Sequence, residues 1–95
     1  MGVNGLMGTI KEFLEGKYPA SDFSFDFPDL LNESGPELEE TNPELYNLLN
    51  EDLPEICSYF EPDDEARNQR PEYLNETQFK EQVQRVYEKA VKLMQ

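Results

Sequence analysis

The stretch that decides the fold lies at the carboxyl end of the chain, where residues 75–94 read NETQFKEQVQRVYEKAVKLM. Its apolar side chains recur with a period of about 3.6 residues, the period of an α-helix. They are Phe79, Val83, Val86, Tyr87, Ala90, Val91 and Met94. Asn75 and Gln78 have the spacing of a capping box, in which each side chain accepts a hydrogen bond from the other residue's backbone N–H. The stretch therefore predicts an amphipathic helix over 76–93.

A second helix is predicted in the middle of the chain. Asn42 is suited to be its N-cap, and Pro43 fits the first helical position because its missing N–H would have no helical partner there. The apolar residues that follow are Leu45, Leu48, Leu49, Leu53, Ile56, Cys57 and Phe60. Pro54 interrupts this pattern, so the sequence predicts either one helix kinked at Pro54 or two short helices, 43–50 and 53–60.

Near the amino end, a short helix over about 5–15 is predicted. Its apolar face consists of Leu6, Ile10, Phe13 and Leu14, and Gly16 can end it. The segment after it leaves two alternatives open. Ser21 as an N-cap before residues 23–31 favours another helix, whereas three alternating phenylalanines are also typical of a strand. Pro28 would break a helix if it lay beyond the first turn.

Two segments have the composition of connections. Residues 32–43 combine Asn, Ser, Gly and Pro with glutamates and contain one large apolar side chain, Leu38, so we expect an exposed, mobile loop. Residues 61–73 hold Pro62, Pro71 and a dense cluster of charges, and we expect them to connect to the last helix.

Together these elements predict an all-α fold. We expect a small antiparallel bundle of three to four main helices, in a single domain over residues 1–95. Its predicted core contains Phe23, Phe27, Phe79 and Tyr87.

The charge of the chain is strongly negative. Asp and Glu total 21 against 8 Lys and Arg, which gives a net charge of -13, and no basic residue occurs between Lys17 and Arg67. Such a surface repels nucleic acid and anionic membranes, because both are bound through Lys and Arg. We therefore expect a basic protein as the partner, no direct contact with nucleic acid or membrane, and a monomer when the chain is free.

Several kinds of chemistry have no support in the sequence. Histidine is absent, and we find no Gly-rich phosphate loop, no Cys pair and no Ser or Thr with a base partner, so we expect no enzymatic activity, no cofactor and no metal. The acidic run at 63–65 lacks the ligand alternation of a calcium loop. Cys57 is the single cysteine and has apolar neighbours, which favours a buried, reduced thiol and a cytoplasmic location. A leader peptide or membrane span is not predicted.

The candidate binding residues lie between positions 51 and 65. Glu51, Asp52 and Glu55 fall within about one helical turn and can share a face. Tyr59 is an interface candidate because tyrosine is a preferred anchor at protein contacts. Glu61 and the acidic run at 63–65 would extend the patch past the helix end.

The string YFEPDDEAR at residues 59–67, followed by a polar connection and an amphipathic helix, resembles immunity proteins of the colicin D type. Residues 51–53 and the helix to Phe60 fit the same pattern, and IKEFLEG at residues 10–16 resembles the first helix of similar proteins from contact-dependent growth inhibition systems.

The resemblance implies a compact helical antidote that binds its toxin one-to-one and plugs the basic cleft of a tRNA-cleaving ribonuclease. By position it carries over Glu51, Asp52, Glu61, Asp63 and Glu65 as toxin-binding residues. To these, local geometry adds Glu55, Tyr59 and Asp64. Two alternatives stay open: an acidic nucleic-acid mimic that regulates a DNA-binding protein, and a small calcium-responsive helical module.

Overall fold

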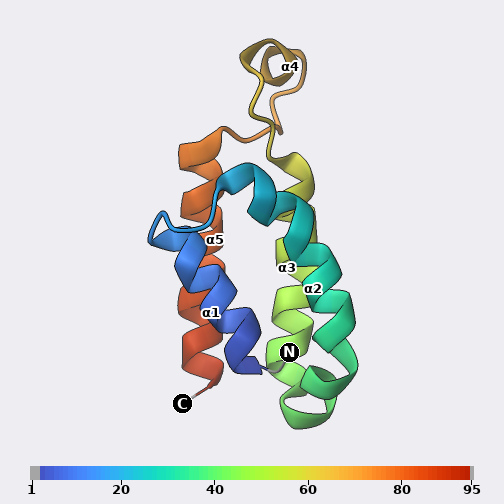
Figure 1. Cartoon of the computed structure of the whole chain (residues 1–95). Helices are drawn as coiled ribbons and strands as arrows, with labels where there is room; N and C mark the ends of the chain where they lie inside the picture. The colour runs from blue at the N-terminus through green and yellow to red at the C-terminus, as the bar shows by residue number, and fades with distance from the viewer. Residues whose placement is uncertain (1–2, 95) are drawn as a thin grey trace.

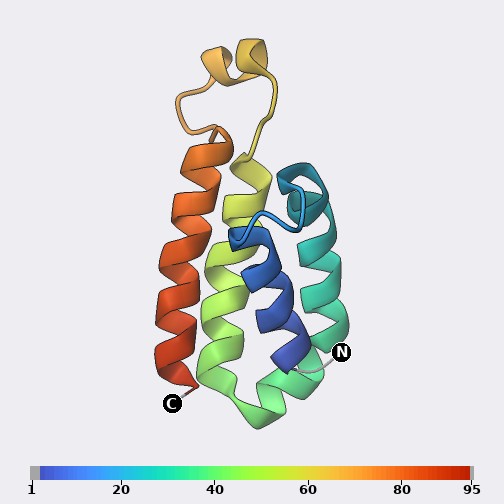
Figure 2. The same cartoon turned by 60° about the vertical axis from the view of Figure 1, so that its left-hand side comes forward.

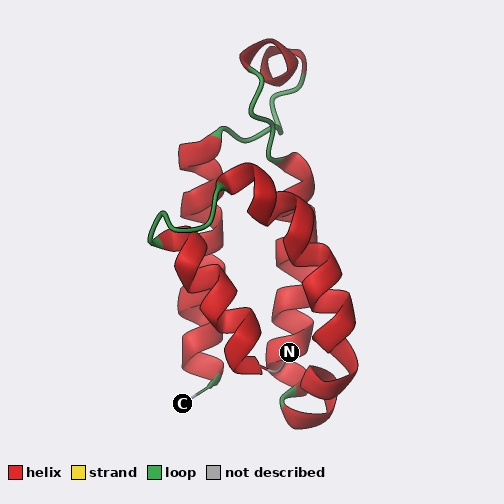
Figure 3. Ribbon diagram, in the orientation of Figure 1, coloured by secondary structure: helices red, strands yellow, loops and turns green. Residues whose placement is uncertain are grey.

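The computed structural model describes residues 3–94, so residues 1, 2 and 95 of the expected domain lie outside the described part. The described chain forms the helices α1 (Val3–Leu14), α2 (Ala20–Thr41), α3 (Pro43–Tyr59), α4 (Asp64–Gln69) and α5 (Glu76–Leu93). Four of them run alternately up and down the long axis, while the short α4 stands apart at one end (Figure 1). Figure 3 shows helices joined by short loops. The predicted all-α antiparallel bundle is therefore confirmed.

The four long helices form a ring in which α1 packs on α2 and α5, and α3 packs on α2 and α5. The last helix has the predicted bounds and the predicted capping box, since Asn75 Oδ1 accepts from Gln78 N at 2.8 Å and Gln78 Oε1 accepts from Asn75 N at 3.0 Å. Asn42 caps α3 by accepting from Leu45 N at 3.2 Å, and its Nδ2 donates to Leu93 O at 3.2 Å. One asparagine thus joins the α2–α3 corner to the end of α5.

Helix α2 differs most from the sequence prediction. It runs without interruption from residue 20 to 41, so the loop expected over 32–43 and the strand alternative are both wrong. Ser21 is not the N-cap either, because Pro19 holds that position and makes no side-chain cap bond. The helix tolerates Pro28 and Pro36 because its inner face is buried on both sides of them. The buried residues are Ala20, Phe23, Phe27, Leu31, Ser34, Gly35 and Leu38.

Glycine has a packing role at the contact between α2 and α3. A Cβ placed on Gly35 would lie 3.1 Å from Tyr46 Cε1, so the glycine lets the ring of Tyr46 lie directly on the α2 backbone. Helix α3 is likewise continuous through Pro54, and the alternative of two short helices is wrong. Leu53 and Cys57 are buried on either side of this proline, and their packing outweighs the single hydrogen bond that proline removes.

Aromatic rings fill the core at the end of the bundle that carries α4. The ring of Phe79 lies 5.1 Å from Phe13, 6.0 Å from Phe23 and 4.7 Å from Phe60, measured between centroids. Phe23, Phe27 and Phe79 are completely buried, as predicted. Tyr87 is only partly buried and packs against the core from its edge, so the prediction that it belongs to the buried core is corrected.

Residues 61–73, here called the lobe, connect α3 to α5 and contain α4. The lobe projects beyond the ends of both helices (Figures 1 and 2). Two backbone bonds hold its base, since Leu74 N donates to Tyr59 O at 2.7 Å and Glu61 N donates to Leu74 O at 3.0 Å. Arg67 Nη1 also donates to Glu61 O at 2.7 Å, which ties α4 to the base of the lobe. No helix in the described part of the chain is long and apolar enough to cross a membrane.

Candidate protein-binding surface

The predicted binding residues divide into a helical group and a lobe group. The helical group lies on α3, where Glu51 and Glu55 are exposed, and Asp52 and Tyr59 are partly buried. The hydroxyl of Tyr59 donates to Glu55 Oε1 at 3.3 Å, so these two side chains meet. Glu51 lies about 12 Å from Tyr59 along the helix axis. The helical group is therefore a strip along α3 rather than a compact cluster.

The lobe group continues past the end of α3, as predicted, but its carboxylates have local roles. Asp63 caps α4 by accepting from Glu65 N at 3.1 Å, and Asp64 forms an ion pair with Arg67. Glu61 is partly buried at the lobe base, and Glu65 is exposed. Because Asp63 and Asp64 hold the lobe in shape, changing either one would alter local structure as well as charge.

Cations from another helix lie beside the α3 strip. A hollow of about 310 Å³ between α3 and α5 is lined by Asp52 and Glu55 on one side and by Arg85 and Lys89 on the other. Arg85 and Lys89 are more than 25 positions away from Asp52 and Glu55 in the sequence. The absence of basic residues between Lys17 and Arg67 therefore gave no sign that these cations lie beside α3. Their charges reduce the negative potential over this part of α3.

A second acidic surface lies on α2, where no carboxylate forms an ion pair with another described residue, and the sequence did not lead us to predict this helix as a binding surface. Six carboxylates follow one another at intervals of three or four residues on the face opposite the buried residues. This acidic stripe consists of Asp22, Asp26, Asp29, Glu33, Glu37 and Glu40. It extends about 27 Å along the helix. The spacing of these carboxylates is helical in the sequence, but three of them fall within residues 32–43, where a loop was predicted.

Near one end of the stripe, Tyr18 forms a hydrogen bond with Asp26. Its hydroxyl donates to Asp26 Oδ2 at 2.6 Å, and this bond fixes the α1–α2 connection against α2. The hydrogen bond to Asp26, then burial, then the charges of Asp26, Asp22 and Glu12 raise the pKa of Tyr18 to about 12. Each of these causes disfavours a further negative charge.

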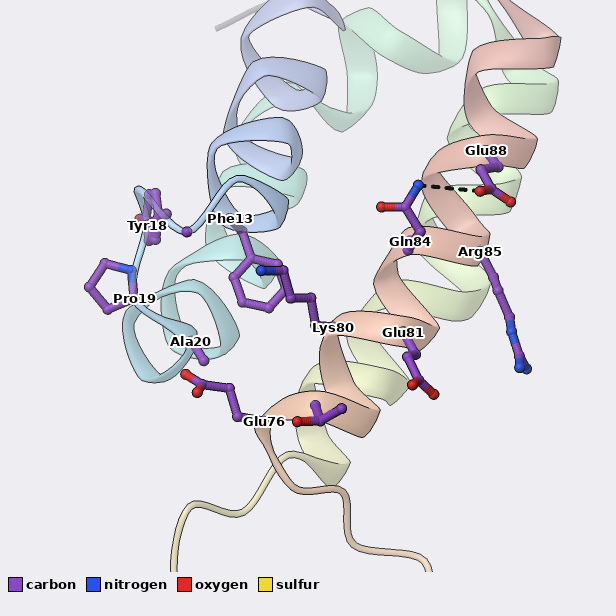
Figure 4. Close-up of a pocket in the computed structure, with 12 residues that line it drawn as sticks. Phe13, Tyr18, Pro19, Ala20, Glu76, Lys80, Glu81, Gln84, Arg85 and Glu88 are labelled. Carbon is purple, nitrogen blue, oxygen red and sulfur yellow. Dashed lines mark hydrogen bonds between the residues drawn. The ribbon is translucent and has the colours of Figure 1, made fainter.

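A groove of about 850 Å³, larger than the hollow between α3 and α5, lies elsewhere. Phe13, Tyr18, Pro19 and Ala20 line one wall, and the first turns of α5 line the other (Figure 4). The α5 wall mixes both signs of charge, from Glu76, Lys80, Glu81, Arg85 and Glu88. None of the predicted binding residues lines this groove.

Within the described residues, no group of three or more His, Cys, Asp or Glu side chains is arranged to hold a metal ion. Cys57 is buried, and burial raises the pKa of its thiol to about 12, so the thiol is protonated at neutral pH.

Comparison of the chain with protein families, with curated proteins and with solved structures returns no match in any of the three. The resemblance to immunity proteins therefore stays a prediction that rests on the residues quoted for it.

Proposed function

We propose that this chain is an immunity protein that binds a basic toxin domain one-to-one and neutralises it by covering its active cleft. The observation that carries the proposal is the separation of charge between helices. Helices α2 and α3 bear seven and four carboxylates respectively, and neither has a Lys or Arg. In the proposal the toxin is a tRNA-cleaving ribonuclease, as the resemblance implies.

The physical reason is competition with a polyanion. A cleft that holds RNA is lined with Lys and Arg, so a protein with closely spaced carboxylates occupies the same positive potential and excludes the substrate. Charge of this magnitude also accelerates encounter with a basic partner through electrostatic steering. The projecting lobe, with Glu65 exposed on it, is the element whose shape suits entry into a cleft.

The proposal places the chain in the cytoplasm of the cell that makes the toxin. The buried, unpaired Cys57 accords with a reducing compartment, where single thiols persist.

The decisive experiment is co-purification of the tagged chain with the product of the neighbouring reading frame, followed by a tRNA-cleavage assay. We expect a basic partner whose cleavage activity stops at one equivalent of this chain, with an affinity that falls as salt rises. Capture of a DNA-binding regulator without nuclease activity would instead favour the nucleic-acid mimic. Failure to bind or inhibit the neighbouring product would refute the immunity proposal.

Charge reversal locates the surface. Glu51→Lys with Glu65→Lys changes two exposed predicted residues that hold no cap or ion pair in the structure. The control, Glu81→Lys with Glu88→Lys on α5, changes net charge equally. We expect the first pair to weaken inhibition at least 10-fold more than the control. Equal effects would mean that net charge alone acts and that the named surface is wrong.

A further inference from the structure

One aromatic side chain on α2 has no role in the packing of the bundle. Phe25 is 78% exposed, whereas Phe23 and Phe27, two residues away on either side, are completely buried. The helical turn accounts for this difference, because positions two apart point about 200° from each other. Apart from Met94, at 42%, no other large apolar side chain in the described part of the chain is exposed.

Phe25 lies at the edge of the acidic stripe. Asp22 precedes it by three residues and Asp29 follows it by four, so both carboxylates are its neighbours on the helix surface. An exposed aromatic ring with charged and polar neighbours is the usual composition of an interface anchor with a polar rim. An exposed ring also costs free energy in the unbound chain, since its apolar area stays in water.

The position of Phe25 connects the stripe to the lobe. Ser21, one turn before Phe25 on the same side of α2, lines a hollow together with Asp64 and Arg67 of the lobe. Figure 1 shows the start of α2 at the end of the bundle from which the lobe projects. Phe25 is therefore about 6 Å along the axis from a residue that borders the lobe, and one partner can reach both.

The charge of this surface determines what can cover it. A second copy of the chain would bring a further charge of -13, and nucleic acid and anionic lipid are repelled for the same reason. A basic protein is the complementary partner. We infer that Phe25 anchors the chain by inserting into an apolar pocket, bordered by Lys and Arg, that lies beside the partner's basic cleft. This inference rests on the proposed function, and it adds a second contact beyond the lobe and the α3 strip.

Aromatic and charged contacts affect different rate constants of binding. Rim charges act mainly on the association rate and its salt dependence, whereas a buried anchor acts mainly on the dissociation rate. Phe25→Ala should therefore raise the dissociation rate and leave the salt dependence of association unchanged. The variant should fold normally, because Phe25 is exposed and alanine has the higher helix propensity.

The test measures binding kinetics against the purified toxin domain encoded beside this chain, with thermal unfolding as the folding control. Met94→Ala is the matched apolar control, since Met94 is exposed at the carboxyl end of α5, whereas the lobe adjoins the amino end of that helix. We expect Phe25→Ala to weaken affinity roughly 10- to 100-fold through dissociation, and Met94→Ala to change it less than 2-fold.

The outcomes separate the inference from the proposed function. Tight wild-type binding with equal affinities for Phe25→Ala and Met94→Ala would overturn the anchor and leave the immunity proposal standing. Loss of affinity carried by the association rate would also overturn it, because the ring would then not be buried in the complex. Absence of wild-type binding would refute both.

Discussion

Removing charge from the acidic stripe should stabilise the free protein. The change is Asp29→Asn with Glu33→Gln, which keeps side-chain shape and removes two exposed charges at the middle of the stripe. In the wild-type protein, carboxylates three or four residues apart on the helix repel each other between positions 26 and 29, 29 and 33, and 33 and 37. Each such pair destabilises a helix by about 0.2–0.5 kcal/mol, so removing all three should raise the free energy of unfolding by about 1 kcal/mol.

A control on α5 removes the same net charge and should not stabilise the protein. Glu81 lies one turn before Arg85, and Glu88 lies one turn before Lys92, so both carboxylates have a favourable partner at four residues. Glu81→Gln with Glu88→Gln should therefore lower stability by a few tenths of a kcal/mol, or leave it unchanged.

Urea and thermal unfolding at neutral pH measure both variants. For a domain of this size, about 1 kcal/mol corresponds to a rise in Tm of about 4–8 °C for the stripe variant. The difference between the two variants should shrink at high salt, since about 1 M salt shortens the screening length to about 3 Å. If both variants shifted Tm equally, net charge alone would control stability and the stripe would have no local effect.

Three further predictions follow from the core, the cap and the thiol. Phe79→Ala should destabilise the protein by about 3–5 kcal/mol in urea unfolding, because a fully buried ring that contacts three others is lost; a loss below about 1 kcal/mol would contradict this packing. Asn42→Ala should cost about 1–2 kcal/mol by thermal unfolding, since it removes the cap bond and the bond to Leu93 O, whereas Asn47→Ala on the exposed side of α3 should cost little. Burial raises the pKa of the Cys57 thiol from 9.0 to about 12, so the folded protein favours the neutral thiol. The stability that comes from burying the neutral thiol is therefore fully present below pH 9 and is lost as the pH rises from 9 towards 12. Thiol labelling of the native protein at pH 8 should be slow, and rapid labelling there would show that Cys57 is accessible.

The elements predicted correctly share one property, which is that local signals and burial agree. For α5 the capping box, the apolar period and the buried face indicate the same bounds, and Asn42 with Pro43 marks the start of α3 equally well. These signals depend on residues within a few positions of each other, so a single sequence carries them.

Helix α2 was mispredicted because composition and packing disagree there. Pro36, Gly35 and the surrounding glutamates are typical of a loop. Leu31, four residues after the buried Phe27, and Leu38, seven residues further on, nevertheless continue the buried face. Burial of that face against α3 outweighs the local preference. Gly35 reads as a helix breaker in sequence, whereas in the fold it allows Tyr46 to approach the backbone.

The candidate surface was predictable only in part. The acidic character of residues 51–65 is correct, but Arg85 and Lys89 reach the same hollow as Asp52 and Glu55 only after α3 and α5 pack together. Contacts between distant segments cannot be obtained from local spacing. Helix α2 also has no cation in its sequence, and none of its carboxylates forms an ion pair with another described residue.

Solubility alone does not account for this distribution of charge. Helix α5 of the same chain has three glutamates among four basic residues, which is the mixed surface that keeps proteins soluble. Helix α2 has seven carboxylates and no cation, and its like charges oppose folding. The repulsion among these carboxylates lowers the stability of the free chain, and only a positively charged partner that covers the stripe would turn it into attraction. If the proposed function is right, the partner should therefore present positive potential over about 27 Å, the length of the stripe. A basic substrate cleft is long enough for this, whereas a site for a single phosphate is not.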